Sequence, residues 1–77
     1  MNIISTLKLV PVESSQISRI GYSEEHEILA IEFIRNDALY YYEDVEKEVF
    51  EKMLKAKSAG RFLGSEIKGK YEYQRMN

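Results

Sequence analysis

The chain has 77 residues, a net charge of −2 and no cysteine. A chain of this length forms one small domain, here residues 1–77, and without cysteine it lacks disulfide bonds and a cysteine-based zinc site. Its apolar runs are far shorter than the roughly 20 residues that cross a bilayer, and its first residues lack the basic and apolar regions of a signal peptide. We therefore expect a cytoplasmic domain with no membrane partner, whose small core gains stability from weak homodimer formation.

The charged residues are unevenly distributed along the chain. Residues 1–51 contain four basic and eleven acidic side chains, a net charge of −7, whereas residues 52–77 contain seven basic and two acidic ones, a net charge of +5. A basic C-terminal third is suited to a phosphate backbone. Cations late in a helix also complement the helix dipole and stay in water, so both interpretations remain open.

The first two predicted strands lie between residues 3 and 22. Residues 3–12 predict a short strand that Pro11 ends or confines to a sheet edge, because proline lacks the backbone N–H. Residues 17–22 predict a second strand, in which Gly21 marks a bulge or a close approach of two backbones. The polar turn at residues 23–26 predicts a hairpin with the strand that follows.

The clearest strand pattern covers residues 28–34, and a returning strand follows at residues 38–42. Three apolar residues alternate on the core face of the first strand: Leu29, Ile31 and Phe33. A two-residue loop at Asn36-Asp37 would pair Phe33 with Tyr40 and turn Tyr40 and Tyr42 toward the core. A three-residue loop would pair Phe33 with Leu39 and turn both tyrosines to the other face. The turn residues do not decide between these registers.

The rest of the chain predicts two helices and a tail. The main helix is expected at residues 45–57, with Asp44 as its N-cap. Its sheet-facing residues are expected to be Val49, Phe50, Met53 and Leu54. Ser58 is expected to cap a shorter helix over residues 60–66 that buries Phe62 and Leu63, and residues 67–73 form an extended tail able to pair with the sheet edge. The fold class is therefore α+β, an antiparallel β-meander of three to four strands followed by one main helix and a short second helix.

An ordered set of residues then carries a family resemblance. Its members are Ser14, Ser15, Ile17, Ile20, Gly21, Tyr22, Leu29, Ile31, Phe33, Tyr40, Tyr42, Val45, Leu54, Ala56, Ser58, Gly60, Phe62, Ile67 and Tyr71. Over about residues 12–73 the chain resembles the KTSC domain, a small family of single-domain bacterial and phage proteins that also occurs at the C-terminus of some lysyl-tRNA synthetases. RNA binding is suspected for that family, so the resemblance implies RNA as a partner. The chain departs from the family pattern at Asn36-Asp37, where a turn glycine is usual, and at Glu46, where proline is usual.

The sequence offers little for catalysis. His26 is the only histidine and lies between Glu25 and Glu27 in a polar turn, where a solvated side chain is expected. Without cysteine or a second histidine, a nucleophile–base pair and a firm transition-metal site lack their parts. Residues 60–64 resemble no phosphate-binding loop. We therefore expect no enzymatic activity, no cofactor and no metal.

Binding has more support from the sequence. Aromatic rings on an open sheet stack on unpaired bases, and nearby cations hold phosphates. The candidate binding residues are Tyr22, Tyr40, Tyr42, Arg61, Lys68, Lys70, Tyr71 and Arg75, with Tyr73 and Arg19 as further sources of a ring and a charge. RNA is the expected partner of this aromatic sheet face and basic C-terminal third. Because tyrosine is common on half-buried sheets and an acidic protein repels nucleic acid, the alternative is a protein-interaction module or homodimer that uses the sheet edge or face.

Overall fold

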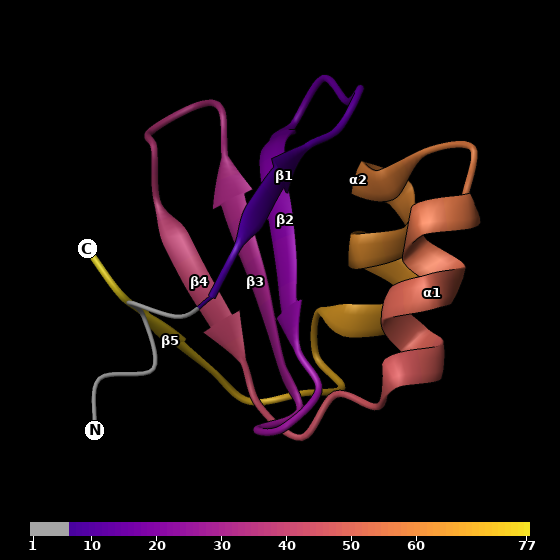
Figure 1. Cartoon of the computed structure of the whole chain (residues 1–77). Helices are drawn as coiled ribbons and strands as arrows, with labels where there is room; N and C mark the ends of the chain where they lie inside the picture. The colour runs from indigo at the N-terminus through magenta and orange to yellow at the C-terminus, as the bar shows by residue number, and fades with distance from the viewer. Residues whose placement is uncertain (1–6) are drawn as a thin grey trace.

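The computed structural model describes residues 7–77 and has the α+β fold that the sequence predicts. Its sheet is a five-stranded antiparallel meander in chain order (Figure 1): β1 (Leu9–Pro11), β2 (Ile17–Ser23), β3 (Ile28–Phe33), β4 (Leu39–Tyr42) and β5 (Tyr73–Arg75). The predicted tail at residues 67–73 overlaps the fifth strand only at Tyr73; this strand follows the helices and pairs with β4. The part of the first predicted strand at residues 3–6 lies outside the described residues.

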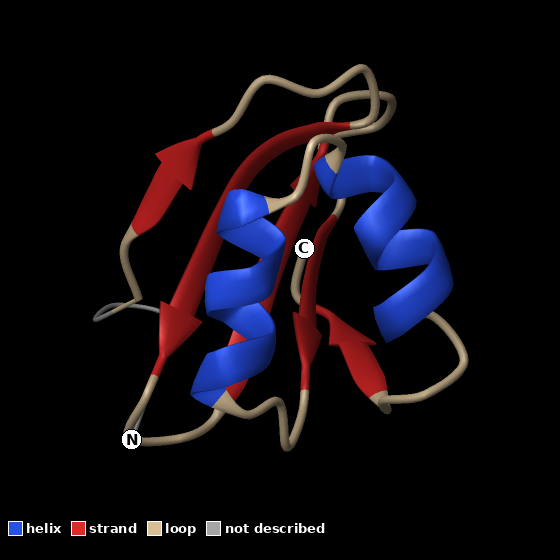
Figure 2. Cartoon of the chain, turned by 90° about the vertical axis from the view of Figure 1, so that its right-hand side faces the viewer, coloured by secondary structure: helices blue, strands red, loops and turns tan. Residues whose placement is uncertain are grey.

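Three helical segments connect β4 to β5 and lie on one face of the sheet (Figure 2): α1 (Lys47–Lys55), α2 (Ala59–Phe62) and the π-helix η2 (Leu63–Ile67). As predicted, Ser58 caps α2, since its hydroxyl accepts a hydrogen bond of 3.2 Å from the Arg61 amide. Within residues 7–77, none of these helices is long and apolar enough to span a bilayer.

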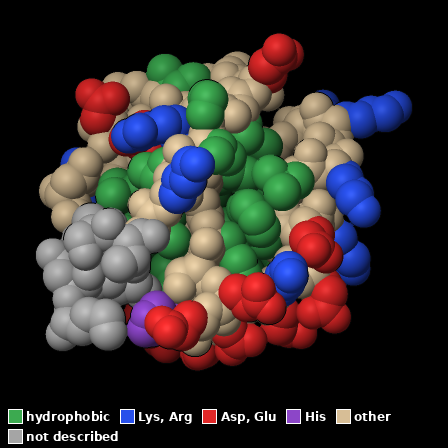
Figure 3. Space-filling view, viewed as in Figure 1, with side chains coloured by type: hydrophobic (Ala, Val, Ile, Leu, Met, Phe, Trp, Pro, Cys, Tyr) green, Lys and Arg blue, Asp and Glu red, His purple; other side chains and the backbone are tan. Residues whose placement is uncertain are grey.

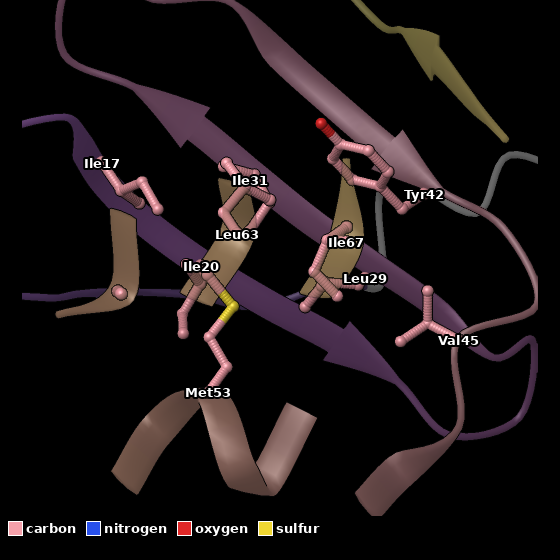
Figure 4. Close-up of a cluster of buried hydrophobic side chains, with 10 residues drawn as sticks. Ile17, Ile20, Leu29, Ile31, Tyr42, Val45, Met53, Leu63 and Ile67 are labelled. Atoms are coloured by element: carbon pink, nitrogen blue, oxygen red, sulfur yellow. The ribbon is translucent and has the colours of Figure 1, made fainter. Parts of the chain in front are cut away.

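The core lies between the sheet and the helices. Figure 4 shows apolar side chains of β2, β3 and β4 meeting those of α1 and η2. The largest fully buried members are Tyr42, Ile17, Ile20, Leu29, Ile31, Met53, Leu63, Ile67 and Val45. Burying one such side chain contributes about 1.5–3 kcal/mol, so this single cluster supplies most of the apolar stabilisation of the small domain. Tyr42 lies at one end of the cluster, with its hydroxyl group turned away from Val45.

The loop between β3 and β4 differs from both predicted registers. Ile31 pairs with Tyr40, and the Phe33 amide donates to the Ala38 carbonyl over 2.9 Å, so the loop contains the four residues 34–37. The Asn36 side chain accepts from the Ala38 amide over 3.2 Å, and Asp37 takes the left-handed conformation with φ of 56°. These two features close a longer turn than either prediction assumed. Tyr40 and Tyr42 still point to the core-facing side of the sheet, as the two-residue loop predicted. The observed pairing differs from that prediction by two residues, and a shift of two residues leaves each side chain on the same face.

The start of α1 is later than predicted. Asp44 is not the N-cap, because it has a left-handed φ of 57° and the helix begins at Lys47, preceded by Glu46 as N-cap. The intervening Val45 is held outside the helix, since its amide donates to the Glu27 carbonyl over 2.8 Å and its carbonyl accepts from the Tyr22 hydroxyl over 2.6 Å. These tertiary bonds compete with the first turn of the predicted helix.

The sheet-facing side of α1 also differs from the prediction at one position. Val49 and Phe50 pack against the core and Met53 is buried, as predicted. Leu54 is 50% exposed, so its assignment to the sheet-facing side is wrong. The helix ends at Lys55, and this short segment has only a narrow apolar face.

Gly21 marks a close approach of two backbones. A Cβ atom there would meet the backbone carbonyl of Lys8 and, at 2.8 Å, the side chain of Leu9. The irregularity in β2 lies elsewhere, between Ile17 and Arg19. Glycine at this position therefore lets the backbone at Lys8 and Leu9 lie close to β2.

Candidate functional site

A row of four aromatic rings crosses β3, β4 and β5 on the helix-facing side of the sheet. Phe33 meets Tyr40 edge-on, with ring centroids 5.3 Å apart. Tyr40 stacks on Tyr73 at 4.9 Å with an angle of 15° between the ring planes, and Tyr73 also contacts Tyr42 at 5.3 Å. We call Phe33, Tyr40, Tyr73 and Tyr42 the aromatic row. Cross-strand pairing produces it, because Tyr42 lies directly opposite Tyr73 and the two-residue period puts Tyr40 on the same face.

Two adjoining hollows flank the centre of the aromatic row. The first has a volume of about 250 Å³ and is lined by Phe33, Arg35, Asn36, Ala38, Tyr40 and Lys68. The second has a volume of about 390 Å³ and is lined by Tyr40, Tyr42, Lys68, Gly69 and Tyr73. Tyr40 and Lys68 line both hollows, so the two adjoin at these residues. We call the two hollows together the aromatic groove.

The π-helix determines where Lys68 lies. The Lys68 amide donates to the carbonyl of Leu63, five residues back, over 2.8 Å. This wider turn ends the helix, Lys68 becomes extended, and Gly69 then reverses the chain with a φ of 82°. The ammonium group of Lys68 consequently lies 6.0 Å from the centroid of the Phe33 ring, at the outer limit of a cation–π contact. π-turns are often found at functional sites, and here the turn places a cation over an aromatic row.

The cations around the groove are not neutralised by neighbouring acids. In the described part of the chain, the ion pairs are Arg19–Glu32, His26–Glu25, Lys47–Glu24 and Lys70–Glu66. None of them involves Lys68, Arg35 or Arg75. Acidic side chains gather at the end of the molecule formed by the β2–β3 turn and the start of α1 (Figure 3). The β3–β4 loop with Arg35 lies at the opposite end of the meander, away from this negative region.

Comparison with known proteins identifies the family. The sequence pattern of the KTSC domain matches residues 13–71, which is most of the chain. The chain belongs to the KTSC domain family. The crystal structure of a KTSC domain protein from Yersinia pestis is similar to this KTSC domain, with a TM-score of 0.88 and 32% sequence identity, over 92% of this chain and 99% of the other.

Two bacterial relatives of the KTSC domain match over similar lengths. A protein of Tsukamurella paurometabola is 43% identical over 61 residues, which cover 79% of this chain and 90% of the relative. An uncharacterised protein of Stutzerimonas stutzeri is 39% identical over 72 residues, which cover 92% of this chain and all of the relative. These relatives support the fold of a small KTSC domain, and its activity has to be inferred from its own residues.

The predicted site residues divide into those around the aromatic groove and those elsewhere. Tyr40 and Lys68 lie at its centre, and Tyr42 closes the second hollow from below as a core residue that is 1% exposed. Arg75 pairs with Tyr40 across β4 and β5, so its exposed side chain starts on the same face. Lys70 and Tyr71 line a neighbouring hollow of about 400 Å³ that shares Gly69 and Tyr73 with the second one.

Other candidates have structural roles or lie outside the groove. Tyr22 is half-buried, stacks on Phe50 at 5.1 Å and donates its hydroxyl hydrogen bond to Val45, so it fastens α1 to the sheet. Arg19 is engaged on the other face of the sheet by both carboxylate oxygens of Glu32, at 2.7 and 2.8 Å. Arg61 is exposed on α2 and lines neither hollow of the aromatic groove. Tyr71 is half-buried and packs against the core.

Five groove residues were absent from the predicted site: Phe33, Arg35, Asn36, Ala38 and Gly69. Phe33 was assigned only to the core, although it is half-buried and its ring lines the first hollow. Arg35 and Asn36 were treated as turn residues alone. The sequence signal for Arg35 and Asn36 was their position shortly after Phe33, the last residue of β3, because side chains of a loop at the end of a strand can line a hollow beside the sheet.

Tyr42 and Tyr73, two neighbouring tyrosines of the groove, differ in their exposure to solvent. Burial raises the pKa of the Tyr42 hydroxyl to about 12, and the nearby hydroxyls of Tyr73 and Tyr40 add to this effect. A neutral, buried Tyr42 therefore forms the floor of the groove. Tyr73 is 54% exposed, which leaves one face of its ring available for contact. Among residues 7–77 no group of three or more histidine, cysteine, aspartate or glutamate side chains is placed to hold a metal ion.

Proposed function

We propose that this KTSC domain is a non-enzymatic module that binds single-stranded RNA in the aromatic groove. The observation that carries the proposal is the position of Lys68 between two hollows that Phe33, Tyr40 and Tyr73 line with rings. Unpaired bases stack on exposed aromatic rings, and a cation beside the rings holds the connecting phosphate. Base-paired RNA offers neither free base faces nor a strand thin enough for hollows of this size.

The affinity is expected to be modest. Stacking contributes roughly 1–3 kcal/mol per base, and among the aromatic residues that line the groove only Tyr73 is more than half exposed. The net charge of −2 opposes general attraction of a polyanion. Because few cations surround the groove, we expect contacts to about one to three phosphates, which gives a salt slope of about −0.7 to −2 for single strands.

Titration of a fluorescent single-stranded RNA octamer at low and moderate salt tests this function. Tyr73→Ala is expected to weaken binding by about fivefold or more, because it removes the exposed ring, whereas Tyr73→Phe keeps the ring and retains binding. Lys68→Ala should weaken binding across RNA sequences and flatten the salt dependence.

Matched variants separate binding from folding in this experiment. Lys52→Ala removes the same charge from α1 and lies outside the groove, so it should bind like the parent chain. Tyr73 is exposed, and circular dichroism should show that its variants stay folded. Absence of binding at low salt and high micromolar protein would exclude RNA and favour the protein-interaction alternative, including the homodimer, which sedimentation at the same concentration would detect.

A further inference from the structure

We infer that the aromatic groove is a two-nucleotide site, with one base in each hollow and the phosphate between them on Lys68, and that the first hollow recognises guanine. This inference rests on the proposed function and specifies its ligand. Its foundation is that Tyr40 and Lys68 line both hollows, so that the two hollows adjoin at these residues.

The groups that line the groove correspond to the parts of one dinucleotide step. A dinucleotide presents a base, a phosphate and a second base. The groove presents a hollow beside Phe33, the ammonium group of Lys68, and a second hollow beside Tyr73. The Lys68 side chain is exposed and has no ion-pair partner among residues 7–77, so its charge is available to a phosphate oxygen.

The second hollow is lined mainly by rings. Tyr73 stacks on Tyr40 at 4.9 Å and exposes its other side, and Gly69 adds no side chain to obstruct the approach of a base. Stacking on tyrosine is tolerant of base identity, because every base has a π-face. We therefore assign the second hollow to a base of any kind.

The first hollow differs because it also contains the side chains of Asn36 and Arg35, two donor groups that the second hollow lacks. The Asn36 side-chain oxygen already accepts from the Ala38 amide over 3.2 Å, which orients the side chain and leaves its NH₂ group as a donor. The Arg35 guanidinium has only donors, and it lines the same hollow. A set of donors selects a base edge with adjacent acceptors, and guanine presents such a pair in O6 and N7. We therefore assign base recognition, with a preference for guanine, to the first hollow.

Competition with short unlabelled RNAs against a fluorescent octamer tests the footprint. A GpU or UpG dinucleotide is expected to compete about fivefold or more better than guanosine monophosphate, because it adds one stacked base. A tetranucleotide should gain at most about threefold more, the statistical advantage of three overlapping two-nucleotide registers. An affinity that rises steeply with every nucleotide up to eight would overturn the inference, as would a dinucleotide that competes no better than the monophosphate.

Base recognition is tested with dinucleotides and the variant Asn36→Ala. The parent chain should prefer a guanine-containing dinucleotide over UpU and ApA, and Asn36→Ala should reduce that preference while binding to UpU is retained. Equal binding of all dinucleotides, or a preference for another base, would contradict the recognition. If the octamer binds and these expectations fail, the two-nucleotide site is wrong and RNA binding stands; if no RNA of any length binds, the proposed function itself is wrong.

Discussion

Tyr42 and Tyr73 lie opposite each other in neighbouring strands, yet their surroundings differ. Tyr42 is enclosed by the core from β2, β3 and η2, whereas Tyr73 lies on the outermost strand of the described sheet and is more than half exposed. The first ring stabilises the fold and the second is available to a ligand. Changes at these two residues should therefore separate stability from binding.

Tyr42 makes the stability of the domain sensitive to high pH. Its pKa of about 12 in the folded state exceeds the value near 10 of an unfolded chain. The stabilising effect is fully present below about pH 10, where both states are protonated, and is lost as the pH rises from about 10 to about 12. The free energy of unfolding should fall by about 1 kcal/mol between about pH 8 and about pH 11.

Denaturant unfolding at the two pH values measures this loss, and Tyr42→Phe is the control. The variant lacks the hydroxyl, so its alkaline loss should be distinctly smaller than that of the parent chain. Equal losses in both proteins would show that Tyr22 and Tyr41, whose pKa values are also raised by burial, dominate the alkaline transition instead.

At the residue scale, two of the predicted binding residues lie at the centre of the candidate groove, and the residues of its rim were not predicted. Tyr40 and Lys68 were predicted from the combination of rings and cations, and both lie at the centre of the groove. Tyr22 has the same side-chain chemistry but binds Val45 and Phe50, a role that depends on contacts between distant segments. Residue type indicates what a side chain can do, while its tertiary neighbours decide whether it is free to do so.

At the scale of elements, α1 offers a direct test of which side faces the sheet. Phe50 is half-buried, stacks on Tyr22 and packs against the core, so Phe50→Ala should cost about 2–4 kcal/mol, at the lower end of values for buried phenylalanine. Leu54, four residues later on the same helix, is 50% exposed, and Leu54→Ala should cost under about 1 kcal/mol. Chemical denaturation measures both, and the reverse order would mean that α1 is rotated relative to this packing.

Two glycines provide a second test at this scale. Gly64 lies in the π-helix with no atom within 4 Å of an added Cβ, so Gly64→Ala should stabilise the domain by about 0.5–1 kcal/mol. Gly21→Ala would push against the Lys8 carbonyl and should destabilise it by about 1–3 kcal/mol, a typical cost of overpacking. Thermal unfolding compares the two variants, and a stable Gly21→Ala protein would argue against the close approach of the Lys8 carbonyl to Gly21.

The sequence predicted most elements because local patterns determine them. Alternating Leu29, Ile31 and Phe33 define β3, and Ser58 defines the start of α2. The length of the β3–β4 loop was not predictable, because the Asn36 side chain and the left-handed Asp37 close a four-residue turn that no common two-residue signal indicates. The π-helix was also missed, since a single wider turn leaves no periodic pattern of its own.

At the scale of the whole molecule, the acidic end formed by the β2–β3 turn and the start of α1 repels RNA, whereas the end formed by the β3–β4 loop is expected to repel it less (Figure 3). Acidic residues gather at the β2–β3 turn and the start of α1, whereas the β3–β4 loop and Lys68 lie along the aromatic groove. At physiological salt the electrostatic screening length is about 8 Å, whereas the molecule is 34 Å long. The acidic end therefore has only a weak effect on the binding of a phosphate at the first hollow, which the β3–β4 loop lines. The orientation of a bound strand is therefore expected to follow the groove rather than the net charge.

The central claim is that single-stranded RNA occupies the aromatic groove, and an amide NMR titration tests it most directly. Adding unlabelled RNA to ¹⁵N-labelled protein at low salt should shift the amides of residues 33–36, 40, 68–69 and 73, which surround the two hollows. The amides of α1 and of the β2–β3 turn should stay nearly unchanged. Shifts concentrated on α1 or β1, or no shifts at high micromolar RNA, would contradict the account.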